Sequence, residues 1–216
     1  MPKVELLIPL MSVFFCLTVG LVYFKRIPGS LKLLVVQAIV AFTGDMIGSM
    51  FSKFGIPNHI FFNIYIPIDF LLMLFATRIF FGKKYWRAAG IAVIIFFAGW
   101  GYAMLHKGPY VFANHSVILG SIMLIIAYFM VLLKQTQEAR NEYTFGIFCI
   151  GGSVMLFYCC IIPNMGFLHY LIRLDMDLAS RLNVITNVVS TLRYIFTGIG
   201  FLLLARHFKP PIHAYK

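Results

Sequence analysis

The chain has 216 residues, of which 61% are hydrophobic and only 12% are charged. A soluble domain is about half apolar and a quarter charged, so this composition excludes an ordinary soluble protein and indicates a protein of the lipid bilayer. The net charge of +11 does not indicate nucleic-acid binding, because the basic residues form short clusters between apolar runs, and we expect no nucleic-acid partner.

Apolar runs follow one another along the chain, each close to the roughly 20 residues that cross a bilayer. We predict seven spans, over residues 6–24, 31–51, 60–81, 88–105, 111–133, 144–162 and 182–205. The first run is too long for the core of a signal peptide and has no small-residue cleavage site before Lys25. Gly, Pro and Asn residues separate the runs, as Pro163 and Asn164 do after the sixth. The sequence therefore predicts an all-α membrane protein, a single seven-transmembrane-helix bundle.

Lys and Arg residues accumulate in every other connection, and this asymmetry sets the direction of the spans. The first, third and fifth connections and the C-terminal tail contain Lys25, Arg26, Lys32, Arg78, Lys83, Lys84, Arg87, Lys134, Arg140, Arg206, Lys209 and Lys216. The other connections contain Lys53, Lys107, Arg173 and Arg181. Because basic connections stay in the cytoplasm, we expect the N-terminus outside and the C-terminus inside, in the cytoplasmic (inner) membrane of a bacterium.

The layout also admits a 3+1+3 parallel repeat, with the fourth helix as a charge-poor linker. Asn63 precedes Asp69 by six positions in the third span, and Asn187 precedes Arg193 by six in the seventh. The layout resembles that of small sugar transporters, although their paired Pro-Gln signatures are missing here.

Three ionisable side chains lie inside predicted spans and away from the span ends, where each costs about 2.5–3.5 kcal/mol on insertion scales. Asp45 is in the outward half of the second span, and Asp69 and Arg193 are near the middle of the third and seventh. The latter two are at similar depth and could form a bidentate pair. Such a pair either joins helices or belongs to a binding site, and both interpretations stay open.

Polar residues extend outward from Arg193 along one face of the seventh span, at i, i+3, i+4 and i+7: Asn183, Thr186, Asn187 and Ser190. A polar face on a membrane helix must meet protein or water. In the third span, Pro67 leaves the carbonyl of Asn63 without its usual donor, a feature typical of cavity walls. We expect an outward-facing cavity with Asp69, Arg193, Asn63, Asn183, Asn187 and Ser190 as ligand-binding residues. Interhelical hydrogen bonding is the alternative for any single one of them.

Several functional classes require residues that this sequence lacks. The seventh span has no lysine between Arg181 and Arg206 for a retinal Schiff base, and the chain has no H-E-x-x-H, G-x-S-x-G or P-loop motif. Its four cysteines lie in apolar stretches without metal-ligand spacing. We therefore expect no metal and no cofactor, and the sequence favours a protein that is not an enzyme.

The segments Asn63-Ile-Tyr-Ile-Pro-Ile-Asp69-Phe-Leu-Leu and 183–201 resemble a family of small bacterial seven-helix integral membrane proteins. These proteins pair an N-x-Y-x-x-x-[acid]-F segment on the third helix with a polar seventh helix. The resemblance implies the fold but no function. Separately, Gly44-Asp45 is similar to the intramembrane Gly-Asp pair of lysoplasmalogenase-like lipid hydrolases.

Two functions follow as hypotheses. The first is a multi-pass protein that binds, and could translocate or sense, a small polar or amphiphilic ligand in the outward-facing cavity, with membrane lipids as its surroundings. The alternative is an intramembrane lipid hydrolase in which Asp45, Asp69 and His115 activate water. The sequence leaves ligand identity and oligomeric state open.

Overall fold

The computed structural model describes residues 2–81, 85–137, 142–174 and 176–207, with the backbone alone at 2–6, 52, 168–169, 171–174 and 176–183. Seven α-helices occupy these ranges: α1 (Pro2–Val22), α2 (Lys32–Lys53), α3 (His59–Ala76), α4 (Tyr85–Lys107), α5 (Asn114–Thr136), α6 (Glu142–Leu174) and α7 (Met176–His207). Short 3-10 turns, η1 (Gly29–Leu31) and η2 (Thr77–Phe80), precede α2 and follow α3.

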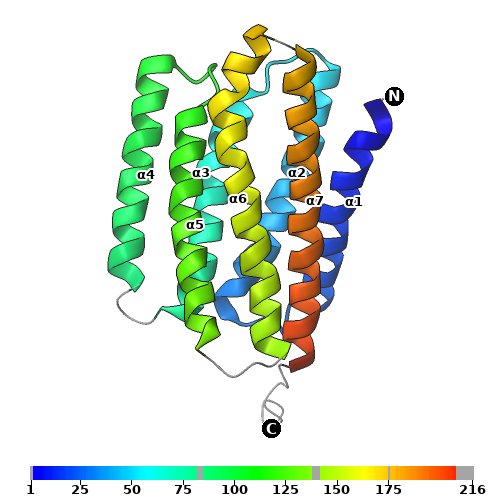
Figure 1. Ribbon diagram of the computed structural model, residues 1–216, viewed down its shortest axis with the longest axis vertical. Helices are drawn as coiled ribbons and strands as arrows, with labels where there is room; N and C mark the ends of the chain where they lie inside the picture. The colour runs from blue at the N-terminus through cyan, green and yellow to red at the C-terminus, as the bar shows by residue number, and fades with distance from the viewer. Residues whose placement is uncertain (1, 82–84, 138–141, 175, 208–216) are drawn as a thin grey trace.

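The described helices confirm the prediction of an all-helical membrane protein. Six of them, α2 to α7, are long and apolar enough to cross a bilayer. In α1 the apolar stretch Leu7–Val22 is shorter. The helices run up and down side by side, as Figure 1 shows, which is the arrangement that spanning helices with short connections adopt.

Contacts between the helices form a ring. Each of α1, α2, α3, α5, α6 and α7 packs on the next, and α1 closes the ring by packing on α7. The remaining long helix, α4, packs on α3 and α5 at the periphery, at the left edge of Figure 1. The ring therefore encloses the space that α2, α3, α5, α6 and α7 share.

The sixth helix is longer than the sixth predicted span, which ends at residue 162. It continues through Pro163 to Leu174, and α7 begins at Met176 instead of near residue 182. A proline inside a helix removes only one backbone hydrogen bond. Where no water competes for backbone groups, the chain loses less by keeping the remaining helical bonds than by unwinding. The helix therefore extends past the proline at which the predicted span ends.

The two ends of the bundle are packed differently. We call the upper half the one where α2, α4 and α6 end, and the lower half the one where α1, α3, α5 and α7 end; they are the upper and lower parts of Figure 1. In the lower half, a group of apolar side chains is at most 2% exposed: Leu31, Leu34, Val35, Val131, Ile147, Ile150, Phe201 and Leu204. A void of about 10 Å³ beside Tyr128 is at the lower limit of the space that one water needs.

Close helix approach explains this density. A Cβ atom built on Gly200 of α7 would lie 2.8 Å from the carbonyl oxygen of Gly146 on α6 and 2.5 Å from Cγ1 of Ile150. Small residues at such a crossing let two membrane helices pack backbone to backbone. The lower half is therefore closed by direct contact between α6 and α7.

Candidate functional site

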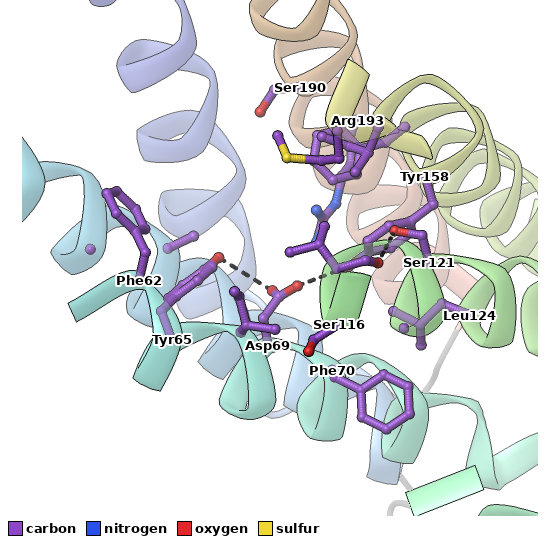
Figure 2. A pocket seen from close by; sticks show the side chains of 18 of the residues that line it. Phe62, Tyr65, Asp69, Phe70, Ser116, Ser121, Leu124, Tyr158, Ser190 and Arg193 are labelled. Carbon is purple, nitrogen blue, oxygen red and sulfur yellow. Dashed lines mark hydrogen bonds between the residues drawn. The ribbon is translucent and has the colours of Figure 1, made fainter. Parts of the chain in front are cut away.

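The upper half contains a cavity of about 240 Å³ (Figure 2). Its walls are mainly apolar, as in most small-molecule sites. The apolar and small lining residues are Ala41, Gly44, Phe62, Ile66, Phe70, Phe96, Phe112, Val117, Gly120, Leu124, Phe157, Ile161 and Met165. The polar lining residues are Asp45, Tyr65, Asp69, Ser116, Ser121, Tyr158, Ser190, Arg193 and Tyr194. We call this space the upper cavity.

Asp69 is the centre of a hydrogen-bond network at the lower end of the upper cavity. Its Oδ1 accepts hydrogen bonds from Nε2 of Gln37, at 2.8 Å, and from the hydroxyl of Tyr65, at 3.3 Å. Its Oδ2 accepts one from the hydroxyl of Tyr158, at 2.8 Å. Tyr65 and Asp69 are one turn apart on α3 and so share a face, whereas Gln37 and Tyr158 come from α2 and α6. The carboxylate thus joins three helices.

Arg193 reaches the same space from α7 and is 4% exposed. Its Nη2 donates to Sδ of Met73 at 3.4 Å. The guanidinium carbon lies 4.6 Å from the ring centre of Phe157, 5.5 Å from that of Tyr158 and 5.2 Å from that of Tyr194. Aromatic faces attract a cation electrostatically and hold its orientation. Figure 2 shows the guanidinium pointing toward the region of Asp69.

The direct Asp69–Arg193 pair that the sequence suggested is not formed. Asp69 receives its hydrogen bonds from neutral donors, and Arg193 is held by a sulfur atom and aromatic rings. Tyr158 contacts both, because its hydroxyl bonds the carboxylate while its ring lies beside the guanidinium. A tyrosine therefore mediates between the two charges, which line one cavity without touching.

Asn63 is 2% exposed and is not among the lining residues of the upper cavity. Its Nδ2 donates to the carbonyls of Pro109 and Val111, at 2.9 and 3.0 Å, and its Oδ1 accepts from the backbone N–H of Ala113 at 3.0 Å. The side chain thus fixes the connection between α4 and α5.

The carbonyl that Pro67 leaves without its helical donor is also occupied. Pro67 lies inside α3, and the indole Nε1 of Trp100 on α4 donates to the carbonyl oxygen of Asn63 at 3.0 Å. A neighbouring helix thus replaces the missing backbone donor, as happens at prolines in membrane helices. The freed carbonyl binds α4 to α3 instead of facing a cavity.

The residues on the polar face of α7 do not all line the upper cavity. Ser190 lines the upper cavity together with Arg193, whereas Asn187 is half-buried and is not in the lining. The side chain of Asn183 lies outside the described residues. The opposite face carries Val184, Ile185 and Val188, which are 39%, 53% and 53% exposed. The described side chains therefore have the polar face turned inward and the apolar face turned outward.

The three residues of the hydrolase alternative are distributed over two cavities. Asp45 and Asp69 line the upper cavity. His115 is exposed and lines a second cavity, of about 380 Å³, between α4 and α5, with Tyr102, His106 and Lys107. Each group that would activate water must reach the same reacting atom, so this separation gives the hydrolase hypothesis no support.

Sequence reasoning missed part of the network. Gln37 is 2% exposed in the second turn of α2 and bonds both Asp69 and the hydroxyl of Tyr194, the latter at 3.3 Å. An amide inside an apolar span was the available signal. Tyr158 and Tyr194, which are 5% and 6% exposed, carry no comparable signal in the sequence. Comparison with known proteins adds no assignment, since the chain matches no protein-family model, no curated protein and no solved structure.

Proposed function

We propose that the protein binds a small amphiphilic ligand in the upper cavity, and that the upper half faces the outside of a bacterial cytoplasmic membrane. The observation that carries the proposal is the combination of apolar walls with a charged lower end formed by the half-buried Asp69 and the buried Arg193. An apolar pocket with a few convergent polar groups is the usual form of a small-molecule site. The proposal concerns binding, because the closely packed lower half lies beneath the cavity.

The orientation rests on the distribution of basic residues. Lys25, Arg26 and Arg206 lie near helix ends of the lower half, and fewer basic residues, among them Lys53 and Lys107, lie at the upper end. Basic residues favour the cytoplasmic side, which leaves the upper cavity outside. The peripheral α4 is compatible with the linker of a 3+1+3 repeat, which we retain as part of the proposal.

The position of Asp45 supports the proposal that the mouth of the upper cavity is filled with water. The residue is exposed, lines the upper cavity and lies inside α2, eight residues before its end at Lys53. At a rise of about 1.5 Å per residue, this places it about 12 Å below the helix end. A carboxylate facing lipid at that depth is costly, whereas one at a water-filled opening is solvated. Ligand and water would enter beside Asp45.

Cysteine labelling tests the proposal. In a variant in which Cys16, Cys149, Cys159 and Cys160 are replaced by Ala, we would introduce Ser190→Cys and, as matched control, Val188→Cys, which lies on the exposed apolar face of α7. A charged, membrane-impermeant methanethiosulfonate reagent is added from the outside of oriented vesicles. We expect rapid labelling at position 190 and slow labelling at position 188, because only the cavity holds water.

The same labelling reaction then tests ligand binding, because a bound ligand should shield position 190 from the reagent. Octanoate, octanol and octyltrimethylammonium share one tail and differ in the charge of the head, and at least one of them should slow the labelling of Ser190→Cys. Labelling that occurs only from the cytoplasmic side would overturn the orientation. Labelling from outside that none of the three compounds slows would overturn ligand binding.

A further inference from the structure

The polar end of the ligand can be assigned a chemical class, an inference that rests on the proposed function. We infer that the upper cavity takes a single-chain amphiphile whose head is an oxyanion, and that Arg193 binds this head. The two charged groups at the lower end of the cavity differ in how far their hydrogen-bonding capacity is used, and this difference carries the inference.

The carboxylate of Asp69 has little capacity left. Two donors, Gln37 and Tyr65, bond Oδ1, and the hydroxyl of Tyr158 bonds Oδ2. An ionised carboxylate offers about four lone-pair positions, and most of them are taken by donors that belong to the protein. An ammonium head of a ligand would have to displace one of these donors. Asp69 is therefore a poor attachment point for a cationic ligand.

The guanidinium of Arg193 has most of its capacity unused. Arginine carries five N–H donors in a planar fork, and the acceptor it finds among the described residues is the thioether of Met73, a weak one. Yet the residue is 4% exposed and lines the upper cavity. A buried cation is costly unless its donors are satisfied, and a carboxylate or phosphate satisfies two of them at once.

Neighbouring hydroxyls point to the same chemistry. Ser116 is 1% exposed, lines the cavity, and its Oγ has no hydrogen-bond partner. Ser190 lies one turn above Arg193 on the same face of α7 and also lines the cavity. Hydroxyls can donate to an oxyanion. At the lower end of the cavity the unused polar capacity therefore consists of the Arg193 guanidinium with two nearby hydroxyl groups, whereas the remaining charged lining residue, Asp45, belongs to the mouth and is solvated there.

The walls and the volume determine the rest of the ligand. Phe62, Phe112 and Met165 line the cavity above Asp69 and Arg193, so an apolar tail fits above a head that is bound by Arg193. A volume of about 240 Å³ is below the roughly 300–1,000 Å³ of sites for larger ligands. One short acyl chain with a compact head is thus the class of ligand that fits, and octanoate is a suitable probe.

The first test uses the wild-type protein. It is placed in phosphatidylcholine nanodiscs, and binding of octanoate, octanol and octyltrimethylammonium is measured by calorimetry, with empty nanodiscs subtracted. We expect saturable binding of octanoate, at least about tenfold tighter than that of octanol, because charge-assisted hydrogen bonds to Arg193 are made only by the anion. We expect no saturable binding of octyltrimethylammonium.

Variants separate recognition from folding. Arg193→Gln should weaken octanoate binding at least about tenfold, and Arg193→Lys should weaken it less, since the charge stays and the planar fork is lost. Arg206→Gln, at an exposed arginine in the last turn of α7, is the matched control and should leave binding unchanged. Asp69→Asn should strengthen octanoate binding, because it removes the negative charge from the cavity. A purely structural Asp69–Arg193 pair would instead lose binding in both variants.

The outcomes distinguish the two proposals. If octanol binds as tightly as octanoate, the oxyanion assignment is overturned while the binding cavity stands. If octyltrimethylammonium binds and octanoate does not, the assignment is overturned in favour of a cationic ligand. If none of the three binds the wild-type protein, the proposed function itself fails, and the oxyanion assignment fails with it.

Discussion

The packed lower half and the surroundings of the upper cavity bury polar groups in different ways. In the lower half, side-chain hydroxyls bond to the backbone: that of Tyr128 to the carbonyl of Met73, at 3.2 Å, and those of Thr77 and Tyr85 to the carbonyl of Leu74. Beside the upper cavity, the side chains of Gln37 and Tyr158 bond another side chain, that of Asp69.

This difference is consistent with the proposed binding role of the upper cavity. A side-chain hydroxyl that donates to a backbone carbonyl adds a hydrogen bond without requiring a cavity, so the helices can approach closely. A network of side chains around a cavity keeps a buried arginine and a half-buried aspartate inside the bundle at some cost in stability. Natural sequences accept such a cost mainly where function requires it. The predictions below alter one half at a time, from the largest expected effect to the smallest.

Glycine-to-alanine substitutions should give the largest difference in unfolding free energy between the two halves. Gly200→Ala places a methyl group 2.8 Å from the carbonyl oxygen of Gly146, and we expect a loss of about 3 kcal/mol in unfolding free energy. Gly44→Ala, in the upper half, meets Tyr65 at an ordinary 3.6 Å. It should be neutral or stabilising by up to about 1 kcal/mol, the helix-propensity difference. Denaturant titration in detergent measures both, and equal costs would contradict the packing difference.

Asn63→Ala should cost about 2 kcal/mol, because it removes three hydrogen bonds and leaves the buried N–H of Ala113 without an acceptor. Octanoate affinity should change little in this variant, since Asn63 does not line the upper cavity. The control is Asn187→Ala, a half-buried position, with an expected cost of at most about 0.5 kcal/mol. A large loss of octanoate binding at unchanged stability would instead place Asn63 in the binding site.

Tyr158→Phe removes one donor to Asp69 and should cost about 1.5 kcal/mol, the upper range for side-chain hydrogen bonds in membranes. The phenyl ring remains to support Arg193. Tyr170→Phe, at a tyrosine that is 63% exposed, is the matched control and should be neutral. If the two substitutions cost the same in thermal unfolding, the network around Asp69 contributes nothing to the fold.

The smallest effect concerns Pro67. Trp100→Phe should cost about 0.6 kcal/mol, because the carbonyl of Asn63 loses its donor. In a Pro67→Ala background the backbone N–H of residue 67 can serve that carbonyl, so the same substitution should cost less. A double-mutant cycle measures this coupling. Additive costs would show that the indole does not replace the helical donor.

The sequence predicts the helices well because apolar runs of spanning length need no tertiary information. It also selects Asp69, Arg193 and Ser190, which line the upper cavity, because charge and polarity within a span are visible residue by residue. The role of Asn63 was not predictable, since it depends on where the connection between α4 and α5 lies. Tyr158 likewise becomes a donor to Asp69 only when α6 packs near α3, a pairing that no local pattern contains.

The most direct test of the account is whether water occupies the upper half and not the lower. Radiolytic hydroxyl-radical footprinting of the protein in nanodiscs oxidises side chains next to ordered or accessible water. We predict that Tyr65 and Tyr158, which line the upper cavity, are oxidised several-fold faster than Tyr128 in the lower half, and that octanoate slows only the first two. If all three tyrosines are oxidised at the same rate in the ligand-free protein, the upper cavity is not filled with water and the account is contradicted.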